Sequence, residues 1–276
     1  MSETKETKDN KKLSFFGHLE ELRWRLVKVA VVILVFAVVL FLYRKEAMDI
    51  VFLSMLYPDF PTYQWFCQLG DLTGIQDLCV AAPLDMSVTS DTMMGEFSAS
   101  MFYSIVGGII CAFPFLFYQV WTFVKPALKL NEMSASKGII FYTSFLFFVG
   151  IAFGYFILSP LCVQFAGTFE LSSKIVNLPS ISSYMSMIVM TTFYTGLLFE
   201  LPVMIFILTK IGVVGPAFLR KFRKHAIVVI LIIAAIITPP DVLSQMIVSI
   251  PIIILYEISI LISVRTEKKR LKKAKQ

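Results

Sequence analysis

Four charged side chains stand directly before a long apolar segment, in the stretch HLEELRWRL at residues 18–26. A carboxylate such as Glu21 can bind a guanidinium ligand through a planar fork, which a lysine ammonium cannot copy. The same residue types also fit an interfacial helix, in which Arg23 and Arg25 anchor a membrane span and Glu21 pairs with Arg25 at i,i+4. A receptor site and a plain anchor are therefore both open at this point.

A second carboxylate follows a basic stretch further along the chain. Glu132 lies six residues after Pro126 in VKPALKLNEMSASK. It can cap a helix or neutralise Lys129, or it can lie beside Glu21 at the same face of a membrane. Two acidic side chains at one face suit a ligand with two adjacent arginines.

Glu200 is the carboxylate that is hardest to explain by structure alone. It lies within LLFELPV, two residues before Pro202, which frees carbonyl groups of the preceding turn. A charge at the centre of a membrane helix costs on the order of 2.5 to 3.5 kcal/mol. We therefore expect Glu200 to be neutral or to face a wet cavity, and we favour a functional role. Asp241 and Gln245, after the TPP turn, fit a hairpin cap and a polar site equally well.

Enzymatic chemistry finds little support in the sequence. His18 and His225 have no companion ligands, and the chain contains no H-E-x-x-H, no G-x-S-x-G and no phosphate-binding glycine loop. We expect no catalytic residue, no metal and no cofactor.

Cysteine usage suggests at most one structural bridge. Cys67 and Cys79 fall in the same polar segment, where an oxidising compartment would allow a disulfide. Cys111 and Cys162 lie in or near apolar segments and are expected to pack.

Composition indicates a polytopic membrane protein. Of the residues, 57% are hydrophobic and 16% are charged, and charge-free runs lie between Glu96 and Lys125 and between Lys137 and Glu170. The net charge of +6 comes from four basic clusters that hold all but three of the 25 lysines and arginines. Clusters in alternate loops orient a membrane protein and do not indicate nucleic acid as a partner.

The elements that position these residues are predicted to be six transmembrane helices in an all-α fold, with both termini cytoplasmic. Residues 1–13 are expected to form a disordered cytoplasmic N-terminus, with Ser14 as the helix N-cap. Residues 14–264 form the membrane domain, and residues 265–276 a basic cytoplasmic tail. Within the domain, residues 44–97 carry eight carboxylates against two basic residues, which indicates an extracytoplasmic cap.

The last two helices are predicted to be short. Only the 12 residues from Ala226 to Ile237 are continuously apolar before TPPD, which at 1.5 Å per residue reaches roughly 18 Å of a core about 30 Å thick. Because basic clusters precede this run and follow Val264, the chain must cross out and back.

The chain resembles the TatC family over about residues 14–264. Five motifs carry the resemblance in the family's order: HLEELRWRL, YQVWTFVKPALKLNE, FVGIAFGYFILSP, FELPV and TPPDVLSQ. It departs from the family pattern in the cap, where Met55 stands near the place of a usual proline, Pro58 is displaced, and the segment is longer, with two cysteines of its own.

The resemblance implies a glove-like bundle in the bacterial cytoplasmic (inner) membrane. It implies that twin-arginine signal peptides of folded precursors are recognised and exported by the proton motive force. Expected partners are single-span TatA and TatB subunits, membrane lipid and further copies of the chain. The residues implied are Glu21, Arg23, Phe123, Pro126 and Glu132 for the signal peptide, Glu200 on the concave face, and Thr238, Asp241 and Gln245 for partner docking.

A proton-coupled small-solute transporter is the alternative. Glu200 and Asp241 would then act as relay groups, and a broken fourth helix is compatible with that. This alternative gives the charged residues at 18–26 no task, and the two halves of the sequence show no inverted repeat. A purely structural scaffold leaves Glu200 unexplained.

Overall fold

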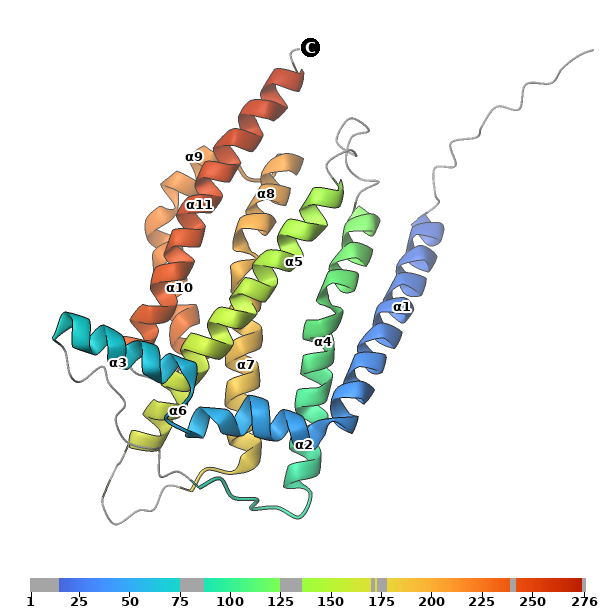
Figure 1. Ribbon diagram of the computed structural model, residues 1–276. Coiled ribbons are helices and arrows are strands. Elements are labelled where there is room, and N and C mark those ends of the chain that lie inside the picture. The colour runs from blue at the N-terminus through green and yellow to red at the C-terminus, as the bar shows by residue number, and fades with distance from the viewer. Residues whose placement is uncertain are drawn as a thin grey trace, which may run out of the picture.

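The described part of the chain is built from helices (Figure 1). The computed structural model describes residues 15–74, 87–124, 136–169, 172, 178–238 and 242–274. Within these residues the extended pairing is limited to one isolated bridge, between Thr89 and Ser180. The predicted disordered N-terminus and the Ser14 cap lie outside the described residues.

Five helical runs among the described residues are long and apolar enough to cross a membrane. The first four lie where the sequence predicts spans, at about residues 27–43, 98–124, 139–160 and 183–208, and the last one contains the predicted final span, which ends near Val264. The apolar stretches are Glu20–Leu42, Gly95–Phe123, Gly138–Thr168, Ile181–Ile211 and Gln245–Lys272. The helices that contain them are α1 (Phe15–Leu42), α4 (Gly95–Val124), α5 (Ser136–Phe153) with the π-helical η6 (Gly154–Leu158) and α6 (Ser159–Thr168), α7 (Ile181–Phe199) with α8 (Leu201–Ile211), and α11 (Val242–Ala274).

The last two helices differ from each other in length. A short helix, α9 (Pro216–Lys221), leads into α10 (Arg223–Ile237), whose 15 residues reach roughly 22 Å and confirm the predicted short helix. The same prediction is wrong for α11, which has 33 residues. Its extra length follows Val264, because the lysine- and arginine-rich segment continues the helix through Ala274. In Figure 1 the joined ends of α10 and α11 stop short of the level that α4 and α7 reach.

Small residues let neighbouring helices approach closely. A Cβ atom on Gly108 of α4 would lie 2.8 Å from the carbonyl oxygen of Ile33 on α1. A Cβ on Gly150 of α5 would lie 2.8 Å from the Phe199 side chain on α7. Close approach at these two crossings packs α1 against α4 and α5 against α7.

The ends of the long helices gather at two sides of the bundle. The start of α1, the end of α4, the start of α5 and the ends of α8 and α11 lie together (Figure 1). We call this side the Glu21 end. The opposite side carries the connection from α1 to α4 and is called the cap end. Both the first and the last described helix thus have their outer ends at the Glu21 end.

A folded cap crosses the opposite end of the bundle. It consists of α2 (Arg44–Ala47), η1 (Met48–Phe52), η2 (Leu53–Leu56) and α3 (Pro61–Thr73). Met55 of the cap is completely buried. Cys67 on α3 is disulfide-bonded, whereas Cys79 lies outside the described residues, so their pairing stays a prediction.

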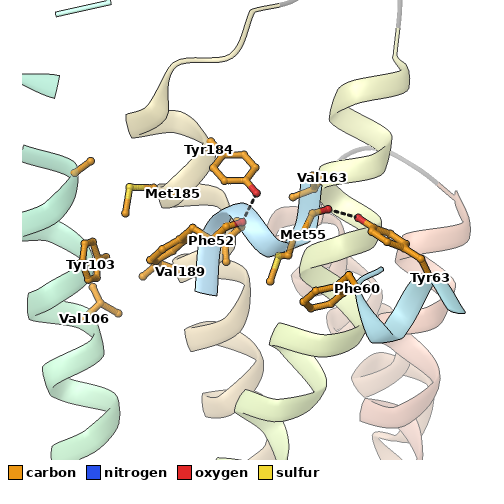
Figure 2. Close-up of a cluster of buried hydrophobic side chains, with 12 residues drawn as sticks. Phe52, Met55, Phe60, Tyr63, Tyr103, Val106, Val163, Tyr184, Met185 and Val189 are labelled. Atoms are coloured by element: carbon orange, nitrogen blue, oxygen red, sulfur yellow. Dashed lines mark hydrogen bonds between the residues drawn. The ribbon is translucent and has the colours of Figure 1, made fainter. Parts of the chain in front are cut away.

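Tyrosine hydroxyls bond carbonyl groups of the cap, one from the bundle and one from within the cap (Figure 2). The hydroxyl of Tyr184 on α7 donates to the carbonyl oxygen of Phe52 at 2.6 Å, and that of Tyr63 on α3 donates to Met55 at 2.8 Å. Burial raises the pKa of Tyr63, so its hydroxyl keeps its proton as a donor. The first bond joins the cap to α7, and the second joins α3 to η2 within the cap.

Candidate functional site

The Glu21 carboxylate is held by an arginine one helical turn away. Oε1 of Glu21 accepts from Nη2 of Arg25 at 2.5 Å and from Nε at 3.1 Å. This i,i+4 pair confirms the pairing predicted from the sequence. The Glu21 side chain is 32% exposed and the Arg25 side chain is 18% exposed. The pair is therefore partly desolvated and still reaches solvent.

The same arginine joins α1 to α4. Nη1 of Arg25 lies 3.3 Å from Oε1 of Gln119 and 3.4 Å from its carbonyl oxygen. Gln119 is buried near the end of α4, where an amide can bond the guanidinium without adding a charge. Arg25 therefore fixes the Glu21 carboxylate relative to two helices.

The other residues predicted for the signal-peptide site are distributed around this pair. Phe123 lies on α4 one turn beyond Gln119 and is half-buried, and Arg23 is exposed on α1. Pro126 and Glu132 lie outside the described residues. The structure thus brings Glu21 and the end of α4 together through Arg25 and Gln119, and it leaves the expected pairing of Glu21 with Glu132 a prediction.

Glu200 lies at a break between two helices, as predicted from Pro202. It is the single residue between α7 and α8, and its carbonyl oxygen accepts from the backbone N–H groups of Val203 and Met204, both at 3.0 Å. The residue is only 8% exposed, and its Oε1 has no hydrogen-bond partner among the described residues. A carboxyl group in such surroundings carries a desolvation penalty that packing alone does not offset.

The residues predicted for partner docking flank the turn between α10 and α11. The Thr238 hydroxyl is buried and donates to the carbonyl oxygen of Ala234 at 2.9 Å. Nε2 of Gln245 donates to the carbonyl oxygen of Leu231 at 3.2 Å, which ties α11 to α10. Asp241 lies outside the described residues.

Sequence reasoning missed the part played by Gln119. The sequence feature that could have indicated this role is the single amide side chain in the apolar run that ends in YQVWTFV. It also did not predict that Glu257 of α11 pairs with Arg223 of α10, which the structure shows at 2.8 Å. Both contacts join segments far apart in the sequence, so spacing within one helix could not predict them.

The apolar helices define a multi-pass helical membrane protein, with a carboxylate–guanidinium pair at the Glu21 end of the bundle. The family described as "Sec-independent protein translocase protein (TatC)" matches residues 17–251, and the chain belongs to this family.

Relatives agree over nearly the whole chain. The TatC protein of Blattabacterium sp. subsp. Periplaneta americana (strain BPLAN) is 35% identical over 95% of this chain and 99% of its own. TatCy of Bacillus subtilis (strain 168) is 34% identical over 91% of this chain and 89% of its own. A crystal structure described as the twin-arginine translocase receptor TatC in DDM covers 89% of this chain and 99% of its own, at 28% identity and a TM-score of 0.69.

Family membership decides between the two functional hypotheses. The chain is a component of the Sec-independent protein translocase, a multi-pass protein of the bacterial inner membrane and not an enzyme. The small-solute transporter is therefore set aside.

Proposed function

We propose that this chain is the signal-peptide receptor of the twin-arginine translocase, and that Glu21 binds an arginine of the signal. The observation that carries the proposal is the Glu21 carboxylate, fixed by Arg25 and Gln119 at the junction of two helices. A carboxylate that already accepts a guanidinium in this place has the geometry needed to accept another.

Binding would follow from an exchange of guanidinium groups. A signal arginine would share or replace Arg25 at the Glu21 carboxylate, and α4 would keep Arg25 nearby through Gln119. At an effective dielectric constant near 20, a charge pair 4 Å apart is worth about 4 kcal/mol before desolvation. A lysine ammonium cannot form the planar fork, so an Arg-Arg signal would bind more tightly than a Lys-Lys one.

The rest of the proposed site comes from the segment that follows α4. Glu132 would take the second arginine, with Phe123 and Pro126 shaping the contact and Arg23 balancing the charge. This part of the proposal is supported by the half-buried position of Phe123, one turn from the Gln119 that holds Arg25.

The same proposal includes the topology. We infer six spans with both termini cytoplasmic, because basic residues fill the last turns of α11, flank α9 and precede α1. The hairpin of α10 and α11 would supply the fifth and sixth spans in a locally thinned bilayer.

Transport and assembly extend the proposal beyond the signal peptide. Folded precursors would cross under the proton motive force, with Glu200 at the concave face of a glove-like bundle. Single-span TatA and TatB subunits would dock near Thr238, Asp241 and Gln245, and several copies of the chain would assemble together. The break at Glu200 and the bond from Gln245 to α10 support the choice of these places.

Photo-crosslinking tests the receptor assignment directly. Membranes with the full chain would be mixed with a precursor that carries a photoreactive residue beside its Arg-Arg or Lys-Lys pair. Glu21→Gln keeps the size of the side chain and removes its charge, and Glu20→Gln does the same at an exposed neighbour on α1.

The expected result is a crosslink that needs both Glu21 and the Arg-Arg pair and that Glu20→Gln leaves intact. The loss of affinity in Glu21→Gln should be about 30-fold or more, as for a charge-assisted bond at a partly buried site. Equal crosslinking of Glu21→Gln and wild type, or of both signals, would return residues 18–26 to a plain interfacial anchor.

A further inference from the structure

A half-open cavity at the cap end combines charged and apolar walls. Its volume is about 440 Å³, and it lies where α1 ends and where α2, α4 and α7 begin. Arg44, Lys45 and Glu96 supply the charged wall. The apolar wall includes Phe41, Met48 and Phe97.

The two basic residues of this cavity are unusual for their place in the chain. Arg44, Lys45 and Lys174 are the basic residues that lie outside the four clusters of the sequence. Among the described residues neither Arg44 nor Lys45 forms an ion pair. Arg44 instead contacts Phe41. Its Nη1 lies 3.5 Å from the Phe41 carbonyl oxygen, and its guanidinium lies 5.3 Å from the centre of the Phe41 ring.

The cavity also lies at the level where a lipid headgroup belongs. Apolar, membrane-length stretches stop at Leu42 and begin at Gly95 and Ile181, and the cavity is lined by residues at or next to these boundaries: Phe41, Glu96 and Ile181. The ring of Phe97 is half exposed and meets that of Phe41 edge to face, with centroids 6.0 Å apart. This aromatic pair continues the lipid-facing surface of α1 and α4 into the cavity.

We propose that this cavity binds a phospholipid whose zwitterionic headgroup ends in a primary ammonium, in the leaflet at the cap end. The phosphate bonds Arg44 and Lys45, the ammonium donates to the Glu96 carboxylate, and the first acyl carbons lie on Phe41 and Phe97. The class of ligand follows from charge complementarity, because two cations and one carboxylate share one cavity.

Other ligands use only part of this wall. Inorganic phosphate leaves the apolar side uncovered, and a purely anionic lipid places no cation at Glu96. A quaternary ammonium has no N–H to donate to the carboxylate, so a choline headgroup gains less there than a primary ammonium. The inference does not involve Glu21 and stands independently of the receptor proposal.

Native mass spectrometry of the purified, delipidated full-length chain tests the proposal. The protein is titrated with phosphatidylethanolamine, phosphatidylcholine or phosphatidylglycerol, and separately with phosphatidylethanolamine in the presence of inorganic phosphate. The variants are Arg44→Ala with Lys45→Ala, and Glu96→Gln. A matched control, Lys268→Ala with Lys272→Ala, removes two basic side chains on α11, at the Glu21 end.

Wild type is expected to prefer phosphatidylethanolamine over the other two lipids. The double Arg44/Lys45 variant should weaken that binding about 30-fold, since each basic residue near a headgroup contributes separately. Glu96→Gln should remove the preference over phosphatidylcholine, and the α11 control should bind as wild type. Unchanged binding in the double variant, no lipid preference in wild type, or displacement by millimolar phosphate would each overturn the proposal.

A measurement on the wild-type chain tests the proposal even if the variants fail to fold. Phosphatidylethanolamine with a photoreactive group near its headgroup is reconstituted with the wild type, and the labelled peptides are sequenced. Labels concentrated within residues 41–48 and 93–103 are expected. Labels spread over all lipid-facing helices would contradict a defined site.

Discussion

Glu21 and Glu200 show two ways in which one membrane protein holds a carboxylate. Glu21 lies at the outer turn of α1, reaches solvent, and accepts two hydrogen bonds from Arg25. Glu200 lies at the junction of α7 and α8, is buried, and has an oxygen without a partner among the described residues. The first carboxylate is already bonded to a guanidinium, and one oxygen of the second has no such partner within the described ranges.

This difference indicates which of the two carboxylates stabilises the fold. The Glu21 pair holds α1 on α4 through Gln119, so its residues contribute to structure whether or not a ligand binds. Glu200 contributes no such bond, and the helix break already has Pro202 and Gly196 nearby to explain it. Stability and transport should therefore respond in opposite directions at Glu200 and in the same direction at Glu21.

The largest effect on stability is expected from Glu200→Met. Methionine fills a similar volume and removes a buried oxygen without a partner, so unfolding should become harder by about 1–3 kcal/mol. If the carboxyl group serves transport, export of a twin-arginine precursor should fall at the same time. The measurements are the apparent Tm of the purified chain in detergent and export in cells that rely on the variant.

Thr143→Val supplies the matched control for that variant. Thr143 of α5 is completely buried, and its hydroxyl also has no partner among the described residues. Valine removes this buried hydroxyl, so it should also raise the apparent Tm. Export should be unchanged. If export also survives Glu200→Met, the Glu200 carboxyl group has no role in transport. The predicted difference between Glu200 and Glu21 would then be wrong.

A smaller effect is expected when the Glu21–Arg25 pair is broken. In a double-mutant cycle with Glu21→Gln and Arg25→Ala, the coupling energy should be about 1 kcal/mol, because the pair is only partly screened by solvent. Arg25→Lys should lose most of that coupling, since an ammonium cannot form the fork and bond Gln119 together. Thermal unfolding of the four proteins measures it, and full coupling with lysine would show that charge alone matters.

Periodicity and charge predicted most of the fold because a membrane restricts the options. Long apolar runs gave the first four spans, and TPPD after Ile237 gave the short α10. The length of α11 was missed because charged residues after Val264 mark the end of an apolar run and do not end a helix. Lysine and arginine are good helix formers, so the helix continues to Ala274.

The candidate site was predictable only where its contacts are local. The bond from Arg25 to Glu21 follows from a spacing of four residues on one helix. The bond from Arg25 to Gln119 joins residues 94 positions apart, and no pattern within α1 indicates it. Met55 is a similar case, since its complete burial depends on tyrosines and helices from distant segments of the chain.

The smallest effect is expected at the second Arg–Glu pair of the described chain. Arg223 and Glu257 join α10 to α11 at 2.8 Å, and their side chains are 48% and 43% exposed. A double-mutant cycle with Arg223→Ala and Glu257→Gln should give a coupling of about 0.2–0.5 kcal/mol, and 0.5 M salt should remove most of it.

The contrast with the Glu21–Arg25 pair then separates exposure from helix geometry. The Glu21–Arg25 pair is less exposed and lies within one helix, so its coupling should be the larger of the two and should lose less in salt. A larger or salt-resistant coupling at Arg223–Glu257 would mean that the surrounding lipid desolvates this pair. In that case a desolvated charge pair would help to hold the hairpin of α10 and α11 together.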